Sequence, residues 1–188
     1  IYGETIKQGY RQWNPQRSKL GAALHNKVSQ FGIRPDATVL YLGSATGTTV
    51  SHVADIVGTK GLVYALDISK VSMRKLMQII PWYPQIAPLL FSASQPQTYM
   101  HYLKQVDVVF ADIAQPDQVD IFVDNCHAFL KQGGYGVIAV KTRSIDITKR
   151  PKQIIAKVHK HIEQVFTITD QRTLEPYQKG HHLFVVKK

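Results

Sequence analysis

The chain has 188 residues, of which 44% are hydrophobic and 19% charged. These proportions are typical of globular proteins and exclude a disordered or collagen-like chain. With 23 Lys and Arg against 13 Asp and Glu, the formal net charge is +10, which favours an anionic partner such as nucleic acid, an acidic membrane surface or an acidic protein. The single cysteine, Cys126, excludes an internal disulfide and a cysteine-based zinc site.

The length predicts one domain, because no repeat, low-complexity tract or Gly/Ser linker divides the sequence. We expect residues 1–35 to form an N-terminal segment with a helix over residues 18–30, and residues 36–188 to form the core. No apolar stretch approaches the roughly 20 residues that span a bilayer, so we expect no membrane segment. The chain begins at Ile1 rather than Met, and we expect an upstream segment in the whole protein.

From residue 39 onward, short apolar runs alternate with amphipathic segments. The runs predict strands over residues 39–42, 62–68, 86–91, 106–113 and 136–141, and the segments that follow them predict helices over residues 48–57, 70–80, 96–103, 116–130 and 151–166. Continuous apolar strands that alternate with helices are typical of a parallel sheet buried on both faces. We therefore expect an α/β fold with a doubly wound, Rossmann-like sheet.

Two more strands are predicted over residues 167–173 and 182–186. The connection between them is too short for a crossover helix, so the last strand is expected to be antiparallel.

Ligands of doubly wound sheets bind beyond the carboxyl ends of the strands. The first predicted strand is followed by a turn that contains Gly43 and Gly47 and leads into a helix, as in cofactor-binding loops, although a tight turn without a ligand is the alternative. The second strand ends near Asp67, twenty residues after Gly47, where an acidic side chain meets the hydroxyls of a ribose. A helix N-cap is the alternative role for Asp67.

The next three predicted strands end near Ser92, Asp112 and Lys141. A lone Asp at a strand end is often a cap and a lone Lys is often solvated. As a set, these residues predict one crevice in which opposite charges keep each other ionised. Together with Asp67, they indicate a site for a nucleoside-bearing cofactor.

Four strings, at residues 13–20, 39–52, 110–118 and 174–177, resemble fibrillarin, and the similarity extends over nearly the whole chain. They read WNPQRSKL, VLYLGSATGTTVSH, FADIAQPDQ and LEPY. Fibrillarin is the S-adenosylmethionine-dependent RNA 2′-O-methyltransferase of C/D-box ribonucleoproteins. The resemblance implies this fold, this cofactor and ribose methylation of rRNA or tRNA.

The resemblance also implies the site residues. The catalytic set would be Lys19, Asp112, Lys141 and His181. The cofactor-binding set would be Gly43, Gly47, Thr48, Thr49, Asp67, Ile68, Ser92, Ala93, Asp112, Ile113, Ala114 and Gln115. The family usually has Glu in place of Asp67 and Asp in place of Ser92, and the second difference removes the usual carboxylate contact to the adenine amino group.

The two adjacent histidines at the last strand point to opposite faces, because side chains alternate along a strand. The match to the family motif selects His181 rather than His182 for the crevice. Lys19 and Lys141 would stabilise charge that develops on the ribose 2′-oxygen, and Asp112 would orient an amine. The sequence leaves open which group takes the hydroxyl proton.

A basic stretch follows the fifth strand. Between residues 141 and 160 stand seven basic residues and one acid, Asp146; the seven are Lys141, Arg143, Lys149, Arg150, Lys152, Lys157 and Lys160. This stretch predicts contact with RNA phosphates, and a solvated helix face is the alternative. Trp13, with basic residues on both sides, could stack on a base or pack beneath the N-terminal helix.

The resemblance implies several partners: a C/D-box guide RNA with its target RNA, a Nop-type scaffold protein and a kink-turn-binding protein. No membrane partner is expected. The location would be the cytoplasm for an archaeal protein and the nucleolus for a domain of a eukaryotic one. Two other functions stay open, namely a non-catalytic assembly subunit, suggested by Ser92, and methylation of a protein glutamine.

Overall fold

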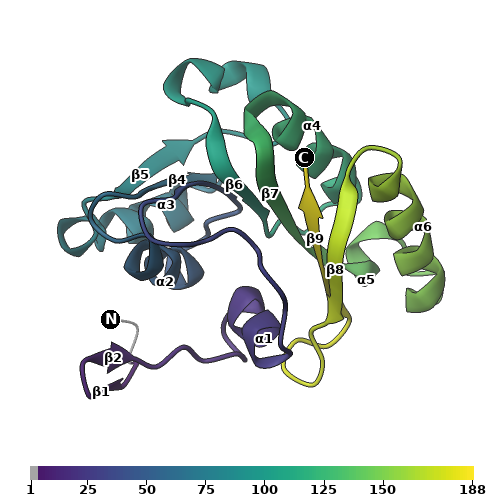
Figure 1. Ribbon diagram of the computed structural model, residues 1–188, viewed down its shortest axis with the longest axis horizontal. Coiled ribbons are helices and arrows are strands. Elements are labelled where there is room, and N and C mark those ends of the chain that lie inside the picture. The colour runs from purple at the N-terminus through teal and green to yellow at the C-terminus, as the bar shows by residue number, and fades with distance from the viewer. Residues whose placement is uncertain (1–3) are drawn as a thin grey trace.

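A seven-stranded sheet forms the centre of the computed structural model, which describes residues 4–188; residues 1–3 of the N-terminal segment lie outside the described residues. The strands are β3 (Thr38–Leu42), β4 (Leu62–Asp67), β5 (Ile86–Leu90), β6 (Val106–Ala111), β7 (Leu130–Lys141), β8 (Thr167–Thr173) and β9 (His181–Lys187). Their order is β5-β4-β3-β6-β7-β9-β8 (Figure 1). Strand β9 is antiparallel to both of its neighbours, and the other pairs are parallel, as predicted.

Helices cover both faces of this sheet. They are α1 (Lys19–His25), α2 (Thr48–Val57), α3 (Lys70–Met77), α4 (Gln118–Phe129), the short α5 (Thr142–Ile145) and α6 (Pro151–Glu163). Alternate side chains of β3 lie on opposite faces of the sheet. Val39 and Tyr41 pack with α1, α2 and α3, whereas Leu40 and Leu42 pack with α4 and α6. Because both sets are apolar, the strand reads as a continuous hydrophobic run. Within residues 4–188, no helix is long and apolar enough to cross a membrane.

The chain changes direction beside β3. After β3 it builds β4 and β5 on one side, and it then returns to place β6 on the other side of β3. The loops that follow β3 and β6 therefore lead to helices on opposite faces of the sheet, α2 on one and α4 on the other, which leaves room between these loops. Such a switch point is where ligands of doubly wound sheets bind.

Residues 96–103 do not form the predicted helix. They form two 3₁₀-helical turns, η2 (Pro96–Thr98) and η3 (Met100–Tyr102). Between them Tyr99 is fully buried, and its hydroxyl donates hydrogen bonds to the side chain of Asn125 and to the carbonyl of Ala93. These tertiary contacts require a backbone conformation at Tyr99 that a continuous helix does not allow.

Several boundaries also differ from the predicted ones. The N-terminal helix ends at His25, because the side chain of Asn26 donates to the carbonyls of Thr173 and Glu175 and Lys27 has a positive φ of 58°. Strand β7 begins at Leu130, six residues earlier than expected, with an irregular register against β6. The hairpin of β1 (Ile6–Lys7) and β2 (Tyr10–Arg11), the turn η1 (Ile80–Trp82) and α5 were not predicted.

Candidate functional site

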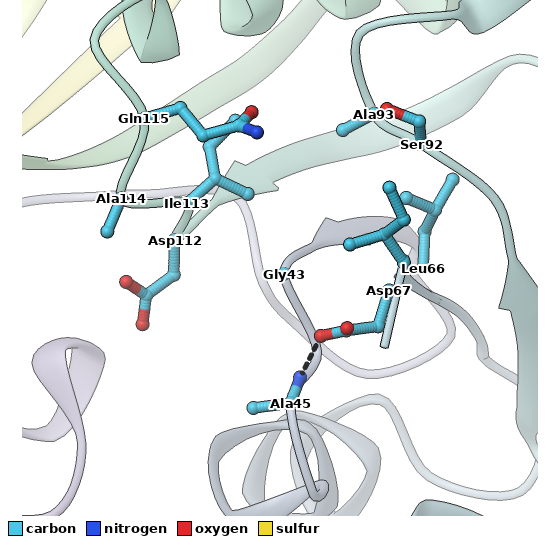
Figure 2. A pocket seen from close by; sticks show the side chains of 11 residues that line it. Gly43, Ala45, Leu66, Asp67, Ser92, Ala93, Asp112, Ile113, Ala114 and Gln115 are labelled. Atoms are coloured by element: carbon cyan, nitrogen blue, oxygen red, sulfur yellow. Dashed lines mark hydrogen bonds between the residues drawn. The ribbon is translucent and has the colours of Figure 1, made fainter. Parts of the chain in front are cut away.

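A cavity of about 250 Å³ lies at the switch point, between the ends of β3, β4 and β6 and the loop after β5. The residues that line it are Gly43, Ala45, Leu66, Asp67, Ile68, Ser92, Ala93, Asp112, Ile113, Ala114 and Gln115 (Figure 2). All residues expected to bind the cofactor line this cavity except Gly47, Thr48 and Thr49. Ala45 and Leu66 also line it, and the sequence did not indicate them because small or apolar side chains carry no chemical signal.

The glycine turn after β3 forms one wall of the cavity. Gly43 has a φ of +82°, and a Cβ atom there would collide with the backbone carbonyl of Asp112. Gly47 has a φ of +97° and stands at the N-cap of α2. Both positions favour glycine, because other residues rarely adopt this backbone conformation, and at Gly43 a side chain would also collide with the neighbouring strand end.

Asp67 ties this turn to the end of β4. One carboxylate oxygen accepts a hydrogen bond from the amide of Ala45 at 2.7 Å, and the other accepts one from the amide of Ser69 at 2.7 Å (Figure 2 shows the first). The N-cap of α3 is Ser69, whose hydroxyl accepts from the amide of Ser72, so Asp67 is not the helix cap. Each oxygen of a carboxylate has two lone pairs, which leaves acceptor capacity on Asp67 for a ligand.

The opposite wall is the segment after β5. The Ser92 hydroxyl lies 2.8 Å from that of Ser94. The carbonyl of Ala93 accepts hydrogen bonds from the carboxamide of Asn125, at 2.9 Å, and from the hydroxyl of Tyr99, at 3.3 Å. Buried groups on α4 and beside it thus fix the backbone of this wall.

An ion pair lies beside the cavity where β6 ends, and its carboxylate belongs to the cavity lining. The ammonium of Lys19 lies 3.0 and 3.2 Å from the two carboxylate oxygens of Asp112. The side chains are 25% and 17% exposed, so solvent screens this pair less than a fully exposed one. Lys19 is the first residue of α1, whose N-cap Ser18 accepts from the amide of Gly21, and this cap sets the position from which Lys19 reaches Asp112.

Lys141 and His181 face each other across the β7–β9 pair. Burial lowers the pKa of His181, and the positive charges of Lys19 and Lys141 lower it further, whereas the carbonyl of Lys179 and the carboxylate of Asp112 raise it. His181 therefore lies within electrostatic range of the three other residues of the expected catalytic set. The fold brings together four side chains that are far apart in the sequence.

The neighbouring histidine points elsewhere. His182 lines a separate groove with Glu175, Lys152 and residues of α6. The alternation expected for the two histidines is therefore present in β9, with His181 on the side of the ion pair.

The three expected cofactor residues that do not line the cavity have other contacts. Gly47 caps α2, and Thr48 is the first residue of that helix, with its carbonyl bonded to the Ser51 hydroxyl. The Thr49 hydroxyl donates to the hydroxyl of Ser18 at 3.0 Å. This last contact holds the start of α1 against α2, and thereby supports the position of Lys19.

Trp13 packs within the protein. Its ring stacks on His52, with centroids 4.5 Å apart and an angle of 7° between the planes, and it lies against Gly21 of α1. The packing role beneath the N-terminal helix is therefore the one that the structure shows.

The basic stretch lies at the end of β7, on α5 and along α6, and all seven of its basic side chains are exposed. Lys149 forms an ion pair with Asp146 at 2.8 Å. Helix α5 begins directly after Lys141, so the stretch adjoins the end of the crevice where the expected catalytic set lies.

The strand order, with a last antiparallel strand, and the cavity at the switch point define the class. They are features of the Rossmann-like S-adenosylmethionine-dependent methyltransferases. Within that class the chain belongs to the fibrillarin family, because the family model described as Fibrillarin matches residues 1–188.

Individual relatives agree with this membership. The chain is 47% identical over 192 residues to the fibrillarin-like rRNA/tRNA 2′-O-methyltransferase of Pyrococcus furiosus, which covers all of this chain and 85% of that protein. A solved fibrillarin/Nop5p complex contains a chain with a TM-score of 0.94 and 42% identity, covering 100% of this chain and 88% of that one. Aeropyrum pernix fibrillarin, solved with natively bound S-adenosyl-L-methionine, has a TM-score of 0.90 and 37% identity, covering 99% and 83%.

Proposed function

We propose that this chain transfers a methyl group from S-adenosylmethionine to the ribose 2′-hydroxyl of rRNA or tRNA. The observation that carries the proposal is the ion pair between Lys19 and Asp112 at the mouth of the cavity, with His181 within electrostatic range of it. The names of the archaeal relatives and the cofactor in the Aeropyrum pernix structure support the same reaction.

The residues that line the cavity suit this cofactor. Asp67 has lone pairs available for the ribose hydroxyls, and the Gly43 turn lets the backbone approach the ligand closely. Ile68 and Ser92 would contact the base, and Asp112 would attract the positive sulfonium. When bound, S-adenosylmethionine supplies a methyl group that is activated by a positively charged sulfur.

The catalytic residues would orient the ribose and manage its proton. Asp112 holds the ammonium of Lys19, and Lys19 and Lys141 would stabilise negative charge on the 2′-oxygen. The ring Nδ1 of His181 lies 3.0 Å from the carbonyl of Lys179, and only a donor can bond to a carbonyl. His181 therefore presents the lone pair of Nε2, and its lowered pKa keeps the ring neutral at pH 7, so that it is able to accept a proton.

RNA would be held largely through its phosphates. The exposed basic stretch adjoins Lys141 and would bind phosphates without reading their sequence. We propose that a C/D-box guide RNA selects the target nucleotide, in a particle that also contains a Nop-type scaffold and a kink-turn-binding protein. The solved fibrillarin/Nop5p complex supports the scaffold partner.

Two further inferences accompany this function. We infer that residues 1–188 form one methyltransferase domain, since within residues 4–188 the helices pack on the two faces of one seven-stranded sheet, with an apolar core on each face. We also infer a cytoplasmic location, because relatives such as those of Pyrococcus furiosus and Methanothermobacter thermautotrophicus are archaeal and archaeal cells have no nucleolus.

The decisive test is methylation mapped by position on a target RNA, with guide RNA, scaffold and kink-turn protein omitted one at a time. We expect efficient methylation only with the full set, at a nucleotide that moves when the guide sequence is shifted. Robust site-specific methylation by the chain alone would contradict guide dependence.

The same assay separates the other two functions. A non-catalytic assembly subunit would enter the particle without any transfer of methyl groups to RNA, and a protein-glutamine methyltransferase would label protein instead of RNA. The Lys19–Asp112 ion pair supports catalysis, because an assembly subunit has no need of a charged pair beside a cofactor cavity.

A further inference from the structure

A fully buried carboxamide lies between the cofactor cavity and the strand end that carries Lys141. It belongs to Gln118, the first residue of α4, which is 0% exposed. Its Nε2 donates a hydrogen bond to the carbonyl of Gln115 at 2.6 Å, and its Oε1 accepts one from the backbone amide of Lys141 at 3.0 Å. Gln118 belongs neither to the expected catalytic set nor to the expected cofactor-binding set.

The amide of Lys141 has no strand partner on the side where Gln118 lies. The last register pair of β6 and β7 is Ala111 with Ile138, so β7 continues beyond the end of β6. On the other side, the amide of the next residue, Thr142, donates to the carbonyl of Gly180. Because amides alternate in direction along a strand, the amide of Lys141 points away from β9, and Gln118 replaces the missing strand as its acceptor.

The other end of the same carboxamide holds a wall of the cavity. Gln115 lines the cavity, and its carbonyl accepts from the backbone amide of Gln118, at 3.2 Å, as well as from the side chain. One side chain therefore links two backbone segments directly. Gln118 itself is fully buried, and a hydrogen bond made by a buried group is geometrically demanding, so this link constrains the distance between the cavity wall and the end of β7.

The link continues toward His181. Thr142 is 1% exposed, and both its amide and its hydroxyl donate to the carbonyl of Gly180, the residue before His181. The backbone amide of Lys141 is thus bonded to Gln118, and the next residue, Thr142, is bonded to the segment that carries His181.

We propose that Gln118 is a positioning residue for methyl transfer, which places Lys141 relative to the cofactor wall. The proposal rests on the proposed function. The side chain of Lys141 is long and exposed, so the position of its ammonium depends on how firmly its backbone is held. The position requires a neutral side chain of this length that donates at one end and accepts at the other, and the carboxamide of glutamine meets this requirement at every pH.

The first test compares two variants of α4 in the assembled particle. Gln118→Met keeps the volume and removes both hydrogen bonds, and we expect a fall of at least about tenfold in the single-turnover rate with saturating cofactor. The cofactor Kd should change by less than about threefold. The matched control is Asn125→Leu, because Asn125 is another fully buried carboxamide of α4. Asn125 donates to the carbonyl of Ala93 in the cavity wall, so this variant should weaken cofactor binding instead of slowing the reaction.

A second variant gives a signature that simple loss of packing would not produce. In Gln118→Glu the protonated carboxyl group can accept from Lys141 and donate to Gln115, whereas the ionised form is repelled by the carbonyl of Gln115. Burial favours the protonated form. We therefore expect the ratio of the variant rate to the wild-type rate to rise as the pH falls. A ratio that stays low and independent of pH would contradict the proposal.

Dependence on Lys141 is tested by combining substitutions. In a Lys141→Ala background, Gln118→Met should cause little further loss of rate, because the residue acts through Lys141. An undiminished loss in that background would overturn the proposal.

A readout without catalysis separates this inference from the proposed function. Backbone amide hydrogen exchange at Lys141 should become faster in Gln118→Met, with the rest of β7 unchanged. Unchanged protection of that amide would refute the positioning role whether or not the particle is active. Absence of methyl transfer by the wild-type particle would instead refute the proposed function.

Discussion

The two sides of the crevice are formed by different parts of the chain: mainly backbone on one side and long side chains on the other. The cofactor side consists of backbone turns and short side chains after β3, β4 and β5, with Asp67 bonded to the amide of Ala45 and Asn125 bonded to the carbonyl of Ala93. The other side, the proposed catalytic side, consists of longer side chains from α1, β7 and β9, among them Lys19, Lys141 and His181.

This difference has a physical consequence. A wall made of hydrogen-bonded backbone is already ordered, so a ligand binds to it without ordering many side chains. Immobilising a lysine costs up to about 2 kcal/mol of side-chain entropy. The protein reduces that cost on the catalytic side with an ion pair for Lys19 and a backbone anchor for Lys141. Substitutions on the two sides should therefore affect different kinetic quantities.

The largest expected effect is on the catalytic side. Lys141→Ala should lower the single-turnover rate with pre-bound cofactor by on the order of 10²–10⁴, as expected for loss of a charge-stabilising group, with little change in cofactor Kd. Asp112→Ala should lower the same rate by a factor in the same range, because the ammonium of Lys19 then loses its ion-pair partner. The control is Lys160→Ala, on the exposed face of α6. A rate for Lys141→Ala within about threefold of wild type would show that the assignment of Lys141 is wrong.

The next effect is on the cofactor side. Asp67→Ala removes a carboxylate that accepts two backbone amides and should raise the cofactor Kd by roughly 10- to 100-fold, in line with about 1.5–3 kcal/mol for hydrogen bonds to charged groups. Calorimetry measures the Kd. Asp124→Ala, an exposed position on α4, provides a control with the same change of charge. An unchanged Kd in Asp67→Ala would show that Asp67 does not contribute to cofactor binding, contrary to its place on the cofactor side.

A gain of affinity should sharpen the comparison. Ser92→Asp introduces a carboxylate at the cavity wall, where it can form a charge-assisted hydrogen bond to the adenine amino group, and should tighten cofactor binding by about three- to tenfold. Rates at saturating cofactor should stay the same. Equal or weaker affinity in a folded variant would contradict the placement of Ser92 beside the base.

The smallest effect concerns the pKa of His181, which lies below its ordinary value because of burial and the charge of Lys19. NMR titration should show this lowered pKa, and Lys19→Met should raise it. The folded protein then binds fewer protons at His181 than the unfolded chain does. The contribution of His181 to stability is therefore present above its ordinary pKa and is lost as the pH falls through that value toward the lower one. If Lys19→Met left the pKa of His181 unchanged, the charge of Lys19 would not act on His181, contrary to this prediction.

Much of the cofactor side could be predicted from the sequence. Gly43 and Asp67 are recognisable because a local pattern, a strand followed by a turn, puts chemically distinctive residues at strand ends. The antiparallel last strand followed from a short connection. The helix expected at residues 96–103 was wrong, because a local pattern does not reveal that Tyr99 must turn inward to meet Asn125 and Ala93.

The sequence by itself determined the alternation of strands and helices, the edge of the sheet at which a ligand binds, and the residue types available there, because these depend on neighbours along the chain. The tertiary structure decided which of those residues meet. The pairing of Lys19 with Asp112 joins positions 93 residues apart, and the bridge from Gln118 to Lys141 depends on β6 ending before β7 does. No local propensity specifies such contacts, because they arise only when helices and strands from distant parts of the chain pack around one crevice.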